Sequence, residues 1–172
     1  MKTKLTVIFL SIIFLTGIES YCQNPTVKND SLKVLLENSK TNKKNLFLIF
    51  GWEGCGWCRL FDKYHSDPKV KEILSKYFLI AYMDIYKSKT GKDLFKEYGK
   101  GGTPSWTIFD INGHILIDSD NGKGNVGYPA KEEELDHYVL ALKKSAPNLP
   151  NSESDFLISK LKDYRNSKEQ NK

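Results

Sequence analysis

The apolar positions of the chain alternate between short continuous runs and runs at helical spacing. Two continuous runs, 46–50 and 78–84, are short for helices and predict strands buried on both faces. Two more strands are predicted at 105–110 and 114–119, because the Asn-Gly pair between them is a strong hairpin signal. The sheet is therefore expected to contain both parallel and antiparallel neighbours.

Helical spacing predicts the elements that connect and flank these strands. A capping aspartate before Pro68 marks the start of one helix, since proline fits the first helical position. A short C-terminal helix is expected at 154–164, followed by a disordered tail. The order of elements indicates an α/β fold, with a mixed central sheet flanked by helices and an extra C-terminal helix. The other predicted helices are one capped by Asp30 or Ser31, 55–65, 92–98 and 131–144.

Residues 1–22 are predicted to be a signal peptide. A short positively charged start precedes an apolar stretch, 5–18, which is shorter than the ~20 residues of a membrane-spanning helix. Small residues favour cleavage after Cys22. Lipid modification of Cys22 is an alternative that Glu19 and Tyr21 disfavour, and an uncleaved anchor is a third. We expect an exported protein, periplasmic or secreted, without a membrane span after cleavage.

The 172-residue chain is long enough for one domain, and its 40% hydrophobic content supports a packed core. We expect 23–45 to hold an N-terminal helix and linker, 46–145 the core, and 146–172 a C-terminal extension. The net charge of +5 comes from basic residues spread along the chain, which indicates solubility and no nucleic-acid binding. A monomer is expected.

Cys55 and Cys58 are the cysteines that remain after cleavage. Two cysteines three apart on a helix have β-carbons ~5–6 Å apart. A disulfide needs ~3.5–4.5 Å, so a small adjustment closes it. At the helix start, unpaired N–H groups favour a negative charge on Cys55, which lowers its pKa and makes it the nucleophile. Cys58, one turn deeper, is expected to attack the resulting mixed disulfide.

Two other interpretations of the pair are weaker. A structural disulfide across so small a loop removes little chain entropy. Structural zinc usually takes four protein ligands, and His65, His114 and His137 are scattered without paired spacing. We therefore expect no metal, and we interpret His65 as a helix-end residue.

The core resembles the thioredoxin superfamily, in particular exported thioredoxin-like proteins with a CGWC motif. The resemblance covers about residues 45–145. It implies a thioredoxin-like fold and thiol–disulfide exchange with protein substrates, with the redox equivalents held in two sulfurs and no organic cofactor. The features that carry it are a strand leading to Cys55-Gly56-Trp57-Cys58 and a helix, Tyr98-Gly99 followed by Thr103-Pro104, the strand pair around Asn112-Gly113, and Val126-Gly127 before the helix at 131–144.

The resemblance also implies roles for single residues. Cys55 is the attacking thiol and Cys58 the resolving thiol. Pro104 is expected to be cis and to face the disulfide, and the substrate backbone is expected to lie against Thr103. The apolar rim around the sulfurs is expected to come from Trp52 and Trp57.

The chain departs from thioredoxin at three positions. Gly54 and Trp57 stand where thioredoxin has tryptophan and proline, and Ile49 stands where it has a buried aspartate. Proton transfer to Cys58 therefore has no assigned base. We interpret Glu53 as a solvated turn residue, and Arg59 as either a thiolate partner or a surface charge.

Together these observations predict an exported thiol–disulfide oxidoreductase, more a reductant than an oxidant, that needs an unidentified recycling partner. The alternative is a binding or chaperone module on the same fold with a non-catalytic disulfide.

Overall fold

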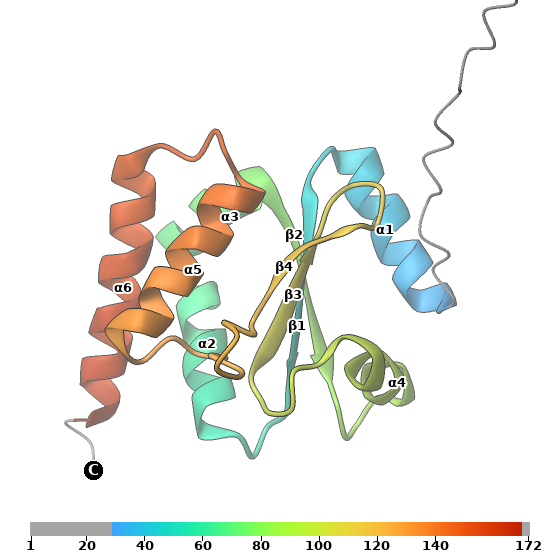
Figure 1. The fold of residues 1–172 in the computed structure, drawn as a ribbon, viewed down its shortest axis with the longest axis horizontal. Helices are drawn as coiled ribbons and strands as arrows, with labels where there is room; N and C mark the ends of the chain where they lie inside the picture. The colour runs from blue at the N-terminus through green and yellow to red at the C-terminus, as the bar shows by residue number, and fades with distance from the viewer. Residues whose placement is uncertain (1–28, 170–172) are drawn as a thin grey trace, which may run out of the picture.

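A computed structural model describes residues 29–169, which form a four-stranded sheet with helices on both faces (Figure 1). The strands lie in the order β2-β1-β3-β4. β1 is parallel to β2 and antiparallel to β3, and β3 is antiparallel to β4, so the sheet is mixed, as predicted. The strands are β1 (Asn45–Gly51), β2 (Phe78–Asp84), β3 (Ser105–Phe109) and β4 (Ile115–Asp118).

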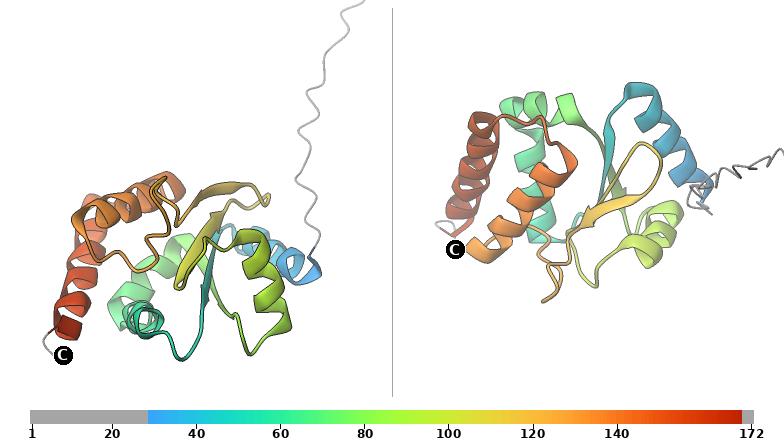
Figure 2. Two further views of the ribbon diagram at one scale, coloured as in Figure 1. Left: turned by 60° about the horizontal axis from the view of Figure 1, so that its bottom comes forward. Right: turned by 45° about the horizontal axis from the view of Figure 1, so that its top comes forward.

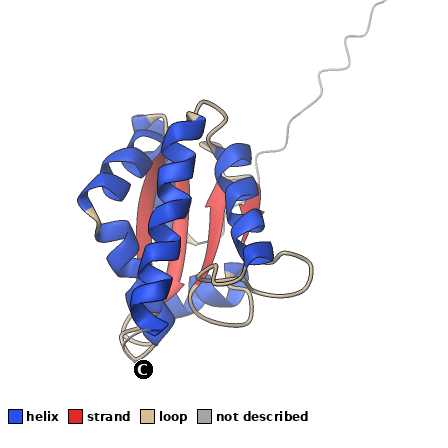
Figure 3. Ribbon diagram, turned by 90° about the vertical axis from the view of Figure 1, so that its left-hand side faces the viewer, coloured by secondary structure: helices blue, strands red, loops and turns tan. Residues whose placement is uncertain are grey.

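Six helices in the described part of the chain cover the sheet in layers. They are α1 (Asp30–Asn42), α2 (Gly56–Ser66), α3 (Pro68–Tyr77), α4 (Lys89–Tyr98), α5 (Glu132–Ser145) and α6 (Asn151–Glu169). α1 and α4 lie on one face, and the other four lie on the opposite face (Figure 2). α6 packs against α2, α3 and α5, and it crosses in front of the strands when the molecule is seen from its side (Figure 3). No helix within 29–169 is both long and apolar enough to cross a membrane.

β1 explains why two separate cores form. Side chains alternate between the two faces of a strand, and both faces of this central strand are covered. Leu46, Leu48 and Phe50 pack with α1 and α4, whereas Phe47 and Ile49 pack with the helices of the other face. The continuous apolar run at 46–50 therefore corresponds to a strand buried on both faces, as predicted.

β2 differs from its prediction. It has the expected bounds, but most of its side chains are half-buried and Tyr82 is 40% exposed. The reason is its place in the sheet, because β2 is an edge strand with only β1 beside it.

Local signals place most helix ends. Asp67 caps α3, accepting hydrogen bonds from the backbone N–H groups of Lys69 and Val70, as its position before Pro68 predicted. α1 is capped by Asn29 rather than by Asp30 or Ser31. The predicted signal peptide, the alternatives at Cys22 and the first residues of 23–45 lie outside the described residues.

The C-terminal helix is longer than predicted. α6 has 19 residues and continues to Glu169, so 165–169 are helical rather than disordered. Leu157 and Leu161 are fully buried, and the Arg165 guanidinium donates a hydrogen bond to the Ala130 carbonyl at 2.6 Å. These contacts hold the later turns of α6 on the domain.

Candidate active site

The site begins where α2 begins, at Cys55. Cys55 has extended backbone angles and is the N-cap residue, and its sulfur accepts a hydrogen bond from the Cys58 backbone N–H at 3.1 Å. A serine or aspartate oxygen usually makes this contact. In the reduced protein the same N–H group and the positive end of the helix dipole stabilise a thiolate. The sequence prediction that Cys55 starts this helix is confirmed.

Cys55 and Cys58 form a disulfide, with α-carbons 5.2 Å apart. Cys55 is half-buried and Cys58 is 6% exposed. The two sulfurs therefore differ in access, with Cys55 toward solvent and Cys58 behind it. This is the arrangement that an attacking and a resolving thiol require.

The loop before β3 faces Cys55. The Thr103–Pro104 peptide bond is cis, as expected, and the Thr103 carbonyl oxygen lies 3.4 Å from the Cys55 sulfur. The backbone of this loop is therefore beside the sulfur that would carry a bound substrate.

Asn125 and Gly127 hold that loop in place. The Asn125 amide donates a hydrogen bond to the Pro104 carbonyl at 2.9 Å. Gly127 has a φ of 48°, and a β-carbon on it would lie 2.4 Å from the Pro104 oxygen. Gly127 was among the residues that carry the family resemblance, whereas Asn125 was missed. Its signal in the sequence is weak, because an asparagine in a glycine-rich turn is ordinary turn chemistry.

Trp57 forms one wall beside the disulfide. Its ring stacks on Tyr128 with centroids 5.4 Å apart. Both rings line a pocket of about 310 Å³ together with Thr103 and Pro104. The structure thus brings Trp57 next to the cis-proline loop, and Tyr128 joins it as a residue that sequence reasoning missed.

Trp52 lies on another side of the motif. Its ring covers Gly54, where a β-carbon would lie 1.8 Å from a ring atom. The ring is also edge-on to Tyr86 at 5.2 Å, and Trp52 is 39% exposed. The tryptophan that thioredoxin places directly before its first cysteine is absent here, but the Trp52 ring lies over that position.

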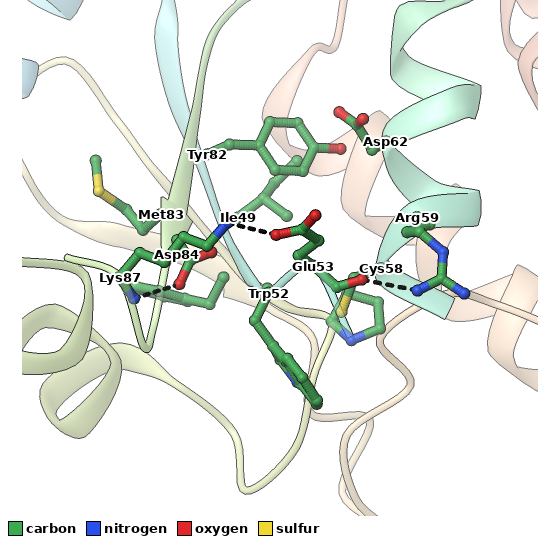
Figure 4. Close-up of a pocket in the computed structure, with 13 residues that line it drawn as sticks. Ile49, Trp52, Glu53, Cys58, Arg59, Asp62, Tyr82, Met83, Asp84 and Lys87 are labelled. Atoms are coloured by element: carbon green, nitrogen blue, oxygen red, sulfur yellow. Dashed lines mark hydrogen bonds and ion pairs between the residues drawn. The ribbon is translucent and has the colours of Figure 1, made fainter. Parts of the chain in front are cut away.

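A second pocket, of about 420 Å³, opens beside Cys58 (Figure 4). Glu53 lies across it, bonded to Lys87 through its carboxylate and to Arg59 through its carbonyl, the latter at 2.7 Å. The Lys87 ammonium holds the pKa of the Glu53 carboxyl below its usual range. Glu53 is exposed, as its interpretation as a solvated turn residue predicted.

No carboxylate takes the place of the buried aspartate of thioredoxin. Ile49 is fully buried, and the nearest acidic residue along α2 is the exposed Asp62, which lines the second pocket. β1 therefore has no buried carboxylate at the position that thioredoxin uses.

His65 lies at the other end of α2, away from the sulfurs. It is 5% exposed, and its Nδ1 lies 2.8 Å from the Phe61 carbonyl oxygen and 2.8 Å from the Tyr82 hydroxyl. Burial lowers the pKa of His65 to about 4. The residue is a neutral, buried helix-end histidine rather than a base for Cys55 or Cys58. Within the described residues, no three His, Cys, Asp or Glu side chains gather in a group suited to a metal ion.

The family model of the thioredoxin-like domain matches residues 32–139, more than half of the chain. The chain belongs to the thioredoxin-like domain family. The match includes the Cys55–Cys58 disulfide, the cis-proline loop and all four strands. No curated protein matches the sequence.

Solved structures with similar folds share little sequence with this chain. A disulphide isomerase from Xylella fastidiosa Temecula1 is 18% identical, with 78% of this chain and 92% of that chain covered and a TM-score of 0.49. DsbH oxidoreductase is 21% identical, with 66% and 79% covered and a TM-score of 0.47. A thioredoxin-fold protein from Helicobacter pylori is 19% identical, with 76% and 88% covered and a TM-score of 0.46. The family assignment rests on the family model alone.

Proposed function

We propose that this thioredoxin-like protein is an exported thiol–disulfide oxidoreductase that reduces disulfides in protein substrates. The observation that carries the proposal is the position of Cys55. Its sulfur caps α2, accepts the Cys58 N–H bond at 3.1 Å and lies half-buried beside the cis-proline loop. A thiolate at such a position is stabilised by the start of the helix and is also accessible to a substrate.

The chemistry follows from the two sulfurs. The Cys55 thiolate attacks one sulfur of a substrate disulfide, and the electron pair leaves on the other substrate sulfur. Cys58, as a thiolate, then attacks the Cys55 sulfur and expels the second substrate thiolate. The substrate gains two electrons and two protons, and the protein ends as the Cys55–Cys58 disulfide that the structure contains.

Substrate contacts are assigned to the surface around Cys55. An extended substrate chain lies against the backbone at Thr103, whose carbonyl is 3.4 Å from the Cys55 sulfur. Pro104 holds this backbone toward the disulfide, and Trp57 and Trp52 supply apolar walls on either side. Aromatic walls suit a segment of unfolded or extended protein, which exposes apolar side chains.

Export, direction and recycling complete the proposal. The charged start and apolar stretch at 1–22 support export, and mass spectrometry of the mature protein tests it, since cleavage leaves Gln23 as the first residue.

The reduction potential of the disulfide tests the direction of the reaction. A value near ~ −270 mV would support a reductant, and one near ~ −120 mV an oxidant. The protein acts as a monomer, and a further redox partner must reduce its disulfide after each turnover.

Substitution of each cysteine tests the assignment. In an insulin-reduction assay, Cys55→Ser is expected to lower the rate to background, because the nucleophile is lost. Cys58→Ser is expected to accumulate mixed disulfides between Cys55 and substrate proteins, which a non-reducing gel reveals. Full activity in Cys55→Ser would refute the assignment.

A further inference from the structure

The C-terminal helix is bonded to a segment that borders the candidate site. α6 lies beyond residue 139, where the match to the family model ends, and it packs outside α2 and α5, farther from the sheet (Figure 1). The Tyr128 hydroxyl donates a hydrogen bond to the Leu161 carbonyl at 2.5 Å. The Arg165 guanidinium donates to the Ala130 carbonyl at 2.6 Å. Leu161 and Arg165 are one helical turn apart, so one face of α6 holds residues 128–130.

Tyr128 is held by two different helices. It is 4% exposed, and burial raises the pKa of its hydroxyl, which therefore stays protonated and donates to α6. Its ring stacks on Trp57, with centroids 5.4 Å apart and an angle of 27° between the planes. The ring also meets Phe61 of α2 edge-on at 5.8 Å. The hydroxyl end of the side chain is thus fixed by α6, and the ring contacts α2.

Trp57 is the residue whose position depends on this contact. It is half-buried in the first turn of α2, between the two cysteines of the motif. Together with Tyr128 it lines the pocket of about 310 Å³ beside Thr103 and Pro104, where the substrate chain is proposed to lie. Binding to a mobile side chain costs conformational entropy, whereas a ring that is already fixed avoids this cost.

The other aromatic wall of the site is built differently. Trp52 meets the Tyr86 ring edge-on at 5.2 Å, but Tyr86 is 71% exposed. A partner ring in solvent restrains its neighbour less than a buried ring does, because it is itself free to move. The two walls therefore differ in how firmly their partner rings are held, and the wall formed by Trp57 is the firmer one.

We propose that Tyr128 is a positioning residue, through which α6 fixes the Trp57 ring beside the cis-proline loop before a substrate binds. The inference rests on the proposed function, because it concerns how the substrate is held. The Cys55 sulfur has its own contacts, to the Cys58 N–H group and the Thr103 carbonyl. Tyr128 therefore acts on substrate binding and not on the reactivity of the thiol.

The variant Tyr128→Phe tests the proposal, because it removes the hydroxyl and keeps the ring. With dithiothreitol as the recycling thiol, we expect the KM for insulin to rise roughly threefold, within the range that one neutral hydrogen bond contributes. The kcat should stay unchanged, since the loss of binding that is equal in the ground and transition states raises KM alone. A lower kcat with an unchanged KM would contradict the positioning role.

Tyr164→Phe is the matched control. It removes another hydroxyl bond between α6 and the rest of the domain, to Asp67 at the start of α3. Tyr164 does not line the pocket that contains Trp57. The KM for insulin should therefore stay at the wild-type value. An equal rise in KM in both variants would mean that α6 only stabilises the fold, and it would overturn the proposal.

Fluorine NMR reports on Trp57 directly. Protein labelled with fluorotryptophan should give three signals, from Trp52, Trp57 and Trp106, and Trp57→Phe identifies the one from Trp57. Tyr128→Phe should shift and broaden the Trp57 signal in the absence of substrate, because the ring becomes more mobile, and should leave the Trp52 signal unchanged. Tyr164→Phe should give the wild-type spectrum. An unchanged Trp57 signal in Tyr128→Phe would overturn the proposal.

The two proposals fail in different ways. If the oxidoreductase function is wrong, the wild-type protein does not reduce insulin, and the fluorine signals still show whether Tyr128 holds Trp57. If the positioning role is wrong, the wild-type protein reduces insulin, and Tyr128→Phe matches it in KM and in the Trp57 signal.

Discussion

The two ends of α2 each carry a group that can gain or lose a proton, and the fold treats them in opposite ways. At the start, Cys55 is half-buried and its sulfur accepts a backbone N–H bond from the first turn. At the end, His65 is buried among aromatic rings, including Phe47 and Phe61. One end is open and polar, and the other is closed and largely apolar.

The contrast shows how one helix serves both reactivity and rigidity. At Cys55, the Cys58 N–H group and the start of the helix lie where they would stabilise a charged sulfur. At His65, burial penalises the charged form, so the neutral imidazole is favoured. A carbonyl only accepts, so the contact with Phe61 places the proton on Nδ1, and Nε2 has no partner among the described residues. The proposed chemistry therefore lies at the first turn, and the last turn anchors the helix to the core.

The largest predicted effect is acid destabilisation at the buried end. The pKa of His65 is about 4 in the folded protein, against a reference value of 6.5. Between these two pH values the unfolded chain binds a proton at His65 and the folded chain does not. Stability therefore falls as the pH drops from 6.5 to about 4, by about 3 kcal/mol. Urea unfolding at several pH values measures this loss.

A matched pair of variants isolates the contribution of His65. His65→Gln cannot be protonated, so its stability should change by about 3 kcal/mol less than that of the wild type over the same pH range. Ser66→Gln changes the exposed neighbour of His65 at the end of α2, adds no titratable group and should keep the wild-type slope. Equal slopes in His65→Gln and wild type would show that the buried end does not exclude the proton.

A smaller effect is predicted where the Gly127 loop meets the cis-proline loop near Cys55. Gly127→Ala and Gly122→Ala both place a side chain at positive φ, 48° and 84°. Only at Gly127 does the new β-carbon meet backbone, 2.4 Å from the Pro104 oxygen. We expect a loss of about 1 kcal/mol for Gly122→Ala and about 2 kcal/mol for Gly127→Ala.

Activity separates these two variants further. Gly127→Ala moves the Thr103–Pro104 backbone away from Cys55, so insulin reduction should fall several-fold, whereas Gly122→Ala should retain the wild-type rate. Similar rates in both variants would mean that the open end of α2 does not depend on the loop that faces it.

The smallest effect is predicted for the ion pair beside the motif. Glu53 and Lys87 are both exposed, and exposed pairs contribute little because water and salt screen them. Lys87→Gln should therefore leave the urea midpoint unchanged. A clear drop in the midpoint would show that the turn before Cys55 is held by charge rather than by the Trp52 ring over Gly54.

The sequence was sufficient for elements whose signals are local. The apolar run of β1, the Asp67-Pro68 start of α3 and the cysteine pair at the start of α2 all lie as predicted. α4 begins at Lys89, three residues before the predicted start at residue 92. The prediction started too late because Gly91, a poor helix former, weakens the helical pattern of the sequence there. That glycine is required by packing, since a β-carbon on it would lie 2.2 Å from the Asp84 carbonyl oxygen.

Spacing and periodicity did not predict contacts between distant segments, and the one that was expected, the cis-proline loop beside Cys55, came from the family resemblance. Asn125 reaches the Pro104 carbonyl across 21 positions, and Lys87 reaches Glu53 across 34. The pocket beside Cys58 depends on such contacts, because β2 supplies one wall and the turn before Cys55 supplies another. No spacing rule along the chain indicates that these segments meet.

The most direct test of the account is a titration of thiolate absorbance in the reduced protein, with Cys58→Ser used to assign Cys55. We predict that Cys55 ionises with a pKa well below the ~8.5 of a free cysteine, because the first turn of α2 stabilises its thiolate. A pKa for Cys55 at or above ~8.5 would contradict the central claim that the start of this helix activates the sulfur.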